Sequence, residues 1–218
     1  EQRKLYLAAV VDAREKLKAA KPEDKMAVFA VLMRLREICC DPRLIADNWE
    51  GGSAKLDACV ELVSSAVEGG HRILLFSQFT SMLELLAKRL DAEGISHFTL
   101  QGSTPKPVRA ELVRRFNGGE VSVFLISLRA GGTGLNLTAA DIVIHYDPWW
   151  NVAAQNQATD RAYRIGQKNP VQVYKLIAQD TIEEKIVELQ QAKQSLADTV
   201  TGTADGAILS MRPDELLQ

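Results

Sequence analysis

The feature of this sequence that most limits its fold is an alternation of short apolar runs with helical patterns, from Ser53 to about Ala178. Two runs, Val121–Ile126 and Ile142–Ile144, are almost continuously apolar, which is typical of strands buried on both faces of a parallel sheet. The expected strands are Ile73–Phe76, Phe98–Leu100, Val121–Ile126, Ile142–Tyr146 and Val171–Ile177. The sequence therefore predicts a doubly wound α/β fold, with a parallel sheet flanked by helices and right-handed crossovers.

Helical segments precede and follow this region. Residues 1–50 carry two apolar stripes at helical spacing, separated by Lys21-Pro22-Glu23-Asp24, so we expect a helical hairpin. Gly51-Gly52-Ser53 is the expected internal boundary, because this composition favours a flexible joint. Further on, Thr181 followed three residues later by Glu184 is a capping-box pattern that predicts the start of another helix. The expected organisation is a helical extension at 1–50, the α/β domain at 51–180, and a C-terminal helix and tail at 181–218.

Composition excludes several classes of protein. The 218 residues carry 26 basic and 28 acidic side chains, a net charge of −2, so any nucleic-acid site must be a local patch or a backbone-amide surface. No apolar run approaches the ~20 residues of a membrane span, and the chain opens without the apolar core of an export signal. Cys39, Cys40 and Cys59 form neither a disulfide framework nor a zinc spacing, which points to a reducing compartment. The three histidines are scattered and expected to be structural, so no metal site is predicted.

Hydroxyl side chains, small residues and glycines crowd the segments that follow the first four expected strands. These segments are Ser77–Thr80, Gln101–Pro105, Ser127–Asn136 and Asp147–Asn151. In a doubly wound sheet, ligands bind at the edge where the strands have their carboxyl ends. Glycines let the backbone approach a bulky ligand, and amides at helix starts bind phosphate oxygens. One glycine-rich turn by itself is more typical of tight strand-to-helix geometry. Four such segments at one edge favour a phosphate-rich ligand.

The sequence lacks the parts that would hold the phosphates of ATP and its Mg²⁺. The loop Gly-x-x-x-x-Gly-Lys-Ser/Thr does not occur, because Gly131-Gly132-Thr133-Gly134 has no following lysine. No acidic pair follows a strand, and the Gly-x-Gly-x-x-Gly pattern of dinucleotide-binding proteins is also missing. We therefore do not expect this chain to hydrolyse ATP by itself.

Three polar residues recur at helical spacing after the fourth strand. Gln157, Arg161 and Arg164 lie at i, i+4 and i+7 of a helix predicted over 151–165, within about 60° of one another on its surface. Two guanidinium groups and an amide on one face suit a γ-phosphoryl group across a cleft. On spacing alone, the alternative is an exposed helix face whose arginines pair with acids such as Asp160.

Ordered motifs in this chain resemble motifs IV to VI of the Swi/Snf family, the helicase-related DNA translocases of superfamily two that include chromatin remodellers. The motifs are Gln101-Gly102-Ser103-Thr104 with Arg109, Ala130–Leu137, Tyr146–Asn151 and Gln157–Gln167. Further segments that resemble the family are Leu32–Leu44 before the second lobe, Ser53–Leu56 at its entry, and Thr181–Ile186 after motif VI. The resemblance implies a RecA-like second lobe, which closes on ATP with a first lobe while duplex DNA lies across both.

The resemblance implies nucleotide-site roles for particular residues. Arg161 and Arg164 match the motif VI arginines that reach the γ-phosphate of ATP held by the first lobe, and Gln157 matches a glutamine that helps to place them. Motif V, which faces the nucleotide cleft and the DNA strand, contributes Gly132, Gly134 and Asn136.

The resemblance also implies DNA contacts. The matching residues are Ser77, Gln78, Gly102, Ser103, Thr104 and Arg109. Trp149 matches a tryptophan implicated in coupling ATP use to DNA movement, and its alternative role is that of a core or interface aromatic. Pro107 departs from the family pattern, but a proline is tolerated in a first helical turn, so we expect a stiffer loop that still forms.

The function implied by this resemblance is that of the second lobe of an ATP-dependent double-stranded-DNA translocase. Its cofactor would be ATP with Mg²⁺, held mainly by the first lobe, and its partners would be that lobe and duplex DNA, with no membrane. An intracellular location is expected, in the cytoplasm or nucleoid of a bacterium or the nucleus of a eukaryote. Two alternatives stay open: the lobe of a strand-separating helicase, which Trp149–Trp150 and Ile165-Gly166-Gln167 disfavour, and a non-catalytic α/β interaction module, which the intact arginines disfavour.

Overall fold

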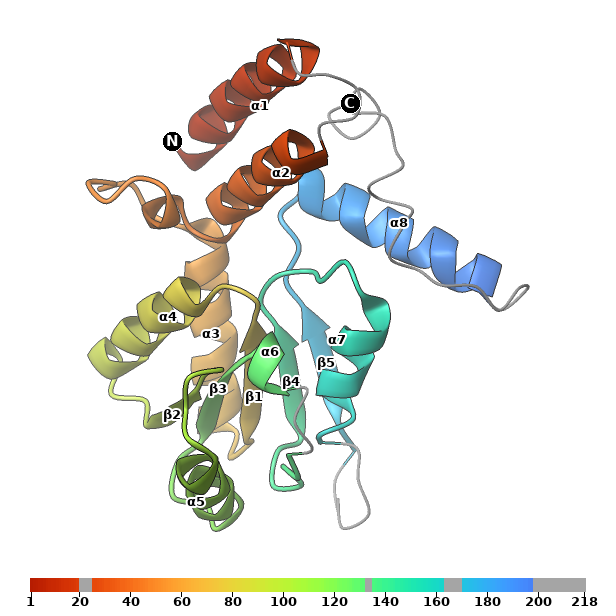
Figure 1. Ribbon diagram of the computed structural model, residues 1–218. Coiled ribbons are helices and arrows are strands. Elements are labelled where there is room, and N and C mark those ends of the chain that lie inside the picture. The colour runs from red at the N-terminus through yellow and green to blue at the C-terminus, as the bar shows by residue number, and fades with distance from the viewer. Residues whose placement is uncertain (20–24, 132–134, 163–169, 198–218) are drawn as a thin grey trace. The chain divides into compact units, whose positions relative to one another are not determined.

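The computed structural model describes residues 1–19, 25–131, 135–162 and 170–197 (Figure 1). The chain divides into two compact units at Lys55/Leu56 and at Leu176/Ile177. We call residues 56–176 the α/β unit. The helical unit joins residues 1–55 to the described residues from Ile177 onward. The C-terminal helix therefore belongs to the same unit as the N-terminal helices.

The α/β unit contains a five-stranded sheet with the order β2-β3-β1-β4-β5, and every neighbouring pair is parallel. The strands are β1 (Ile73–Ser77), β2 (His97–Leu100), β3 (Val123–Ser127), β4 (Ile142–His145) and β5 (Gln172–Lys175). The three central strands are buried along their whole length, as their continuous apolar sequence predicts. The edge strand β5 is mostly exposed and carries polar residues. The prediction of a doubly wound parallel sheet is confirmed.

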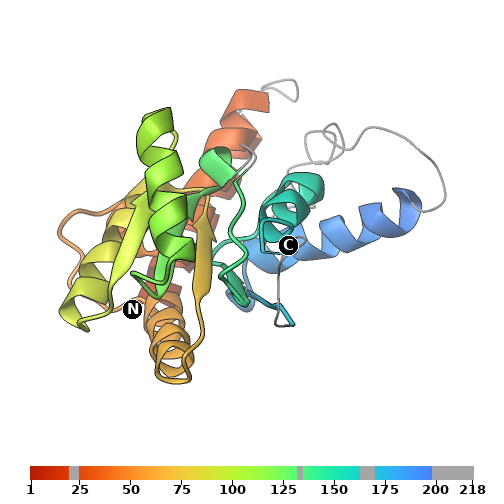
Figure 2. The same cartoon turned by 90° about the horizontal axis from the view of Figure 1, so that it is seen from below.

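Helices cover both faces of this sheet. They are α3 (Ala54–Glu68), α4 (Thr80–Ala92), α5 (Lys106–Asn117), α6 (Leu128–Gly131) and α7 (Val152–Thr159). Figure 2 shows α3 and α4 on one face and α5 and α7 on the other, as right-handed crossovers require for this strand order. Beneath α5, Phe116 packs on Phe124 with ring centroids 5.3 Å apart, within a core of buried apolar side chains.

The helix predicted over 151–165 is shorter in the structure, and this expectation is corrected. Helix α7 ends at Thr159, because the amide of Arg161 donates to the carbonyl of Ala158 at 3.2 Å and the amide of Ala162 donates to Thr159 at 3.1 Å. These three-residue turns tighten the chain and stop the helix. Arg161 therefore lies in a turn and not on the helix that carries Gln157.

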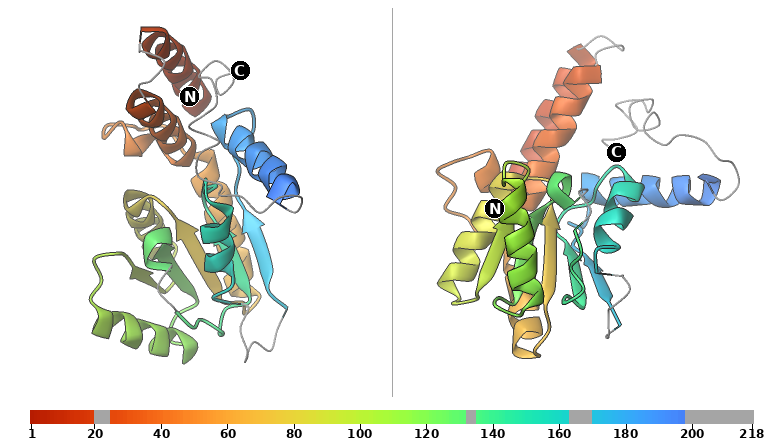
Figure 3. Two further views of the ribbon diagram at one scale, coloured as in Figure 1. Left: turned by 45° about the vertical axis from the view of Figure 1, so that its right-hand side comes forward. Right: turned by 60° about the horizontal axis from the view of Figure 1, so that its bottom comes forward.

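The helical unit contains the predicted N-terminal hairpin. Its elements are α1 (Gln2–Ala19), α2 (Lys25–Cys40), the short 3₁₀ helix η1 (Pro42–Leu44) and α8 (Ile182–Ala197). Helices α1 and α2 lie side by side (Figure 3). Helix α2 stops before Asp41-Pro42, because the residue before a proline is disfavoured in helix. Across the described ranges, no helix combines the length and apolar character that a membrane crossing requires.

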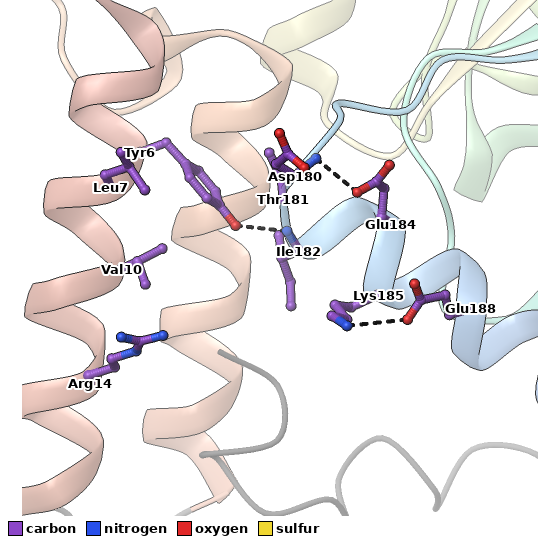
Figure 4. A pocket seen from close by; sticks show the side chains of 10 residues that line it. All are labelled: Tyr6, Leu7, Val10, Arg14, Asp180, Thr181, Ile182, Glu184, Lys185 and Glu188. Carbon is purple, nitrogen blue, oxygen red and sulfur yellow. Dashed lines mark hydrogen bonds and ion pairs between the residues drawn. The ribbon is translucent and has the colours of Figure 1, made fainter. Parts of the chain in front are cut away.

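Helix α8 begins with the side-chain caps that its sequence predicts. The hydroxyl of Thr181 accepts a hydrogen bond from the backbone amide of Glu183 at 3.2 Å. The carboxylate of Glu184 accepts one from the backbone amide of Asp180 at 2.8 Å. The phenol oxygen of Tyr6 on α1 accepts the amide of Ile182 at 2.7 Å, so a third free amide of the helix start is satisfied from a distant segment. Figure 4 shows the contacts of Tyr6 with Ile182 and of Asp180 with Glu184 beside a groove of about 340 Å³.

A buried ion pair joins the entry of α3 to the first turn of α8. Lys55 Nζ donates to Glu183 Oε2, and both side chains are almost fully buried. Burial is the largest single influence and lowers the pKa of Lys55, but the charge and hydrogen bond of Glu183, together with Cys39 and Cys40, outweigh it, so the pKa is raised. Burial, together with the charge of Glu183, raises the pKa of the nearby Cys39 thiol to about 12, so this thiol stays protonated. Cys39 therefore packs as an uncharged side chain in the helical unit.

Breaking this ion pair from one side should strongly destabilise the protein. We expect Lys55→Met to lower the free energy of unfolding by about 3–5 kcal/mol, because it leaves the carboxylate of Glu183 buried without its cation. The double variant Lys55→Met/Glu183→Leu should recover part of this loss. Urea denaturation measures both. The matched control is Lys185→Met, which removes an exposed pair with Glu188 and should cost less than about 1 kcal/mol. Equal losses for Lys55→Met and Lys185→Met would contradict the role given to burial.

Candidate functional site

The connections that leave the carboxyl edge of the sheet diverge at β1. The segment after β1 enters α4 on one face, whereas α6 and α7, which follow β3 and β4, lie on the opposite face. Such a divergence creates a crevice outside the strand ends, which is where ligands of doubly wound sheets bind. Strand β1 is paired with both β3 and β4, so the crevice lies at the centre of the sheet.

At the end of β1, the side chain of Ser77 is committed to the neighbouring strand end. Its hydroxyl donates to Asp147 Oδ1 at 2.6 Å, and the same carboxylate oxygen lies 3.3 Å from the amide of Gln78. The amide of Phe79 donates to Ser77 Oγ at 3.2 Å. Ser77 is fully buried and Gln78 is half-buried, and their DNA contacts stay a prediction.

The segment between β2 and α5 is held in shape by Arg109. Its guanidinium donates to the carbonyls of Thr104 at 2.7 Å and Gly102 at 2.6 Å. The hydroxyl of Thr104 accepts the amide of Gln101 at 3.1 Å, which closes the turn. Gly102 and Ser103 are exposed at its tip. Arg109 thus orders the predicted DNA-contacting loop from within, and Pro107 lies in the first turn of α5 as expected.

The segment after β4 is fastened to α7. The amide of Trp149 donates to Gln155 Oε1 at 3.2 Å, and the side chain of Gln155 is buried. The Trp149 ring is half-buried and packs against the core of the α/β unit. The packing role considered for Trp149 is therefore present, and its coupling role stays a prediction.

His145, the last residue of β4, links that strand to the end of α7. Its Nε2 lies 2.9 Å from the hydroxyl of Thr159, which itself donates to the carbonyl of Gln155 at 3.3 Å. The imidazole is therefore the donor to Thr159. It also stacks on Phe76, with ring centroids 5.6 Å apart. Burial, with a smaller contribution from Lys175, lowers the pKa of His145 to about 4, so the ring is neutral near pH 7.

The predicted nucleotide residues are only partly brought together. Arg161 is 3% exposed, and its carbonyl accepts the amide of Leu137 at 3.1 Å, so the turn after α7 lies against the segment that contains Asn136. Gln157 is exposed on α7 and does not share a helical face with Arg161. Gly132, Gly134 and Arg164 lie outside the described residues.

Sequence reasoning missed three residues of this region. Asp147 was noted only as part of a motif, yet it joins two strand ends. Asn117 holds the motif V segment through its side chain. Its Nδ2 donates to the carbonyl of Asn136 at 2.8 Å, and its Oδ1 accepts a hydrogen bond from the backbone amide of Ala139 at 3.3 Å. Arg129 is exposed on α6 immediately after β3. Of the three, only Arg129 could have been predicted from the sequence, because it is a cation placed directly after a buried strand.

Clusters with the composition of a metal site are not found in the part of the chain that the structure describes. No group of three or more His, Cys, Asp or Glu side chains is arranged there to hold a metal ion.

Comparison with known proteins establishes the family. The family model of the helicase conserved C-terminal domain matches residues 54–166, which is more than half of the chain, so the chain belongs to this family. The matched range contains β1 to β4, the segments at their carboxyl ends and the turn with Arg161.

Named relatives agree with the resemblance to the Swi/Snf family. The chain is 40% identical over 207 residues to the putative ATP-dependent helicase/translocase YwqA of Bacillus subtilis, covering 92% of this chain and 22% of that protein. It is 38% identical over 213 residues to SWI/SNF-related matrix-associated actin-dependent regulator of chromatin subfamily A member 1 of Mus musculus, covering 91% and 20%. The chain thus spans about a fifth of the length of these relatives.

A solved structure extends the likeness to three dimensions. The SWI2/SNF2 ATPase core of Sulfolobus solfataricus in complex with dsDNA matches with a TM-score of 0.83 and 31% identity, over 99% of this chain and 46% of that one. The chain is therefore a C-terminal helicase lobe of the Swi/Snf type, as its motifs predicted.

Acid should destabilise the protein through His145. The unfolded chain takes up this proton below pH 6.5, whereas the folded imidazole stays neutral until about pH 4. Stability contributed by the neutral ring is therefore present above pH 6.5 and is lost as the pH falls to 4, by about 3 kcal/mol at most. Urea denaturation at pH 7, 5.5 and 4.5 measures the free energy of unfolding. Between pH 7 and 4.5 it should fall less in His145→Gln than in the wild-type protein, because glutamine does not take up a proton and its amide can still donate to Thr159. A free energy of unfolding that falls with pH as steeply in His145→Gln as in the wild-type protein would contradict this assignment.

Proposed function

We propose that this chain is the second ATPase lobe of an ATP-dependent double-stranded-DNA translocase. The observation that carries the proposal is the family match over 54–166, because it includes every segment at the divergent edge of the sheet and the turn that holds Arg161. The names of its relatives, helicase/translocase and chromatin regulator, support an ATP-driven activity on DNA for the parent protein. An intracellular location is part of the same proposal.

The proposed DNA surface consists of exposed groups at the carboxyl edge. Gly102 and Ser103 offer backbone amides and a hydroxyl, and Arg109 holds their loop in one conformation. Arg129 presents a cation on α6, and within the described ranges no carboxylate forms an ion pair with it. Amides, hydroxyls and guanidinium groups bind phosphate oxygens without reading bases. A lobe of this kind would grip duplex DNA of any sequence.

The proposed nucleotide contribution is the arginine pair of motif VI. Arg161 is itself buried, where little water screens a guanidinium, so its attraction for a developing phosphoryl charge would be strong. Arg164 belongs to the same proposal but lies outside the described residues. We assign ATP and Mg²⁺ mainly to the first lobe, because this sequence has neither a phosphate loop nor a paired acidic motif. When bound, Mg²⁺ would neutralise charge on the phosphates.

Substitution of the motif VI arginine tests the nucleotide part of the proposal. In the full-length ATPase, Arg161→Lys should lower DNA-stimulated ATP turnover roughly a hundredfold or more, since lysine loses the planar fork that binds two phosphate oxygens. DNA binding should stay near wild type. Turnover is measured with saturating duplex DNA, and Arg89→Lys, an exposed residue paired with Asp57 and Glu93, is the control. The chain by itself should show no DNA-stimulated turnover. ATPase within twofold of wild type in Arg161→Lys would overturn the assignment.

Salt dependence tests the DNA part of the proposal. The isolated chain should bind duplex DNA weakly and without sequence preference, with the logarithm of its affinity falling by about 0.9 per phosphate contact for each logarithm of salt. Arg129→Ala should reduce that slope by about one contact and weaken binding to all sequences alike. Fluorescence anisotropy with two unrelated duplexes measures both quantities, and Arg114→Ala, whose cation pairs with Glu111, is the control. Binding that ignores salt, or that favours one duplex strongly, would refute a backbone-gripping surface.

A further inference from the structure

The paired strands β1 and β4 reach the carboxyl edge of the sheet together. These strands are neighbours with the register Phe76↔His145, and the amide of Tyr146 donates to the carbonyl of Phe76 at 2.9 Å. Beyond that bond the two segments separate toward opposite faces of the sheet, α4 on one and α7 on the other. The regular pairing of the two strands therefore ends here, although the two segments belong to one site.

The carboxylate of Asp147 continues the link one residue past the end of this ladder. One oxygen, Oδ1, accepts the hydroxyl of Ser77 at 2.6 Å and lies 3.3 Å from the amide of Gln78. Ser77 in turn accepts the amide of Phe79 at 3.2 Å, just before α4 begins. The two amides between β1 and α4 are thus both held by this pair of side chains. Asp147 and Ser77 are 1% and 0% exposed, so water does not loosen these bonds.

On its other side, Asp147 belongs to the segment of the half-buried tryptophans. Trp149 follows two residues later, and its amide is fixed by the buried side chain of Gln155 on α7. Helix α7 then leads directly into the turn that contains Arg161. Gln78 is therefore connected to α7 by its hydrogen bond to Asp147, by the backbone from Asp147 to Trp149, and by the hydrogen bond of Trp149 to Gln155.

We propose that Asp147 is a positioning residue that ties the segment after β1 to the segment after β4, so that the DNA-facing loop moves with α7. This inference rests on the proposed function and adds to it a means of transmission between the nucleotide side and the DNA side. Asp147 supplies a buried side-chain link one residue past the hydrogen bond between Tyr146 and Phe76. Asp147 acts through Ser77 and Gln78 and does not itself touch the nucleotide.

Amide exchange tests the link in the chain itself. Asp147→Ala should speed hydrogen exchange at the amides of Gln78 and Phe79 roughly tenfold or more, with a smaller increase at Trp149 and Trp150. Asp147→Asn should stay close to wild type, because its carbonyl oxygen can accept the same two bonds. If Asp147→Ala does not fold, Ser77→Ala removes the donor to Asp147 and the acceptor of the Phe79 amide, and it should speed exchange at Phe79.

The matched control is a carboxylate between the same two strands at their opposite end. Asp141 accepts the amide of Arg72 at 3.0 Å and lies 2.9 Å from His71 Nδ1. Asp141→Ala should speed exchange near Arg72 and leave the amides of Gln78 and Phe79 unchanged. A general loosening of the sheet would instead raise exchange at both ends in both variants, and that result would overturn the proposal.

A coupling measurement completes the test in the full-length ATPase. We expect Asp147→Ala to keep part of the DNA-stimulated ATP turnover while triplex-strand displacement per ATP falls roughly tenfold, with Asp147→Asn restoring most of it and Asp141→Ala leaving the ratio unchanged. A proportional loss of turnover and displacement in Asp147→Ala would refute a transmitting role. If the wild-type protein shows no DNA-stimulated ATPase, the proposed function is wrong, and amide exchange still decides whether Asp147 holds the two segments together.

Discussion

Parallel pairing of all five strands is the constraint on which the α/β unit depends. A parallel pair needs a crossover, the crossovers are right-handed, and the strand order β2-β3-β1-β4-β5 then sends the helix after β1 to one face and those after β3 and β4 to the other. The carboxyl ends of the strands share one edge, so residues far apart in the chain, such as Ser77 and Asp147, become neighbours there. The family-matched segments at this edge owe their proximity to this topology.

Buried polar contacts complete what the backbone leaves open at the ends of the elements. Asp147 links the segments beyond the β1–β4 ladder, Thr159 accepts a hydrogen bond from His145, and Lys55 forms an ion pair with Glu183 at the start of α8. Each of these contacts pairs groups whose burial without a partner would cost free energy. Each also joins segments separated by between 14 and 128 residues, so their effect is to fix position as well as stability.

The sequence predicted the elements more reliably than their ends or their partners. The apolar runs identified all five strands, most clearly the three central ones, where burial on both faces demands continuous apolar residues. The helix predicted from the sequence was longer than α7, because the helical pattern of polar residues continues through Arg161. In the structure the amide of Arg161 donates to the carbonyl of Ala158, and this turn ends the helix. For that reason, the prediction that Gln157 and Arg161 lie on one face of a helix was wrong. Capping at Thr181 was predictable because it is local, whereas the tyrosine that completes it lies at position 6.

What the sequence by itself determined is local: the helical hairpin, the strand–helix alternation, the caps and the ordered motifs that identify a C-terminal lobe of the Swi/Snf type. These depend on neighbouring residues, and a periodic pattern records them directly. Only the tertiary structure decided that Ser77 donates to Asp147, that Arg109 holds its own loop, and that the C-terminal helix joins the N-terminal helices in one unit. Those outcomes depend on which distant groups meet when the chain closes and on which buried polar atom needs a partner, and no local pattern encodes either.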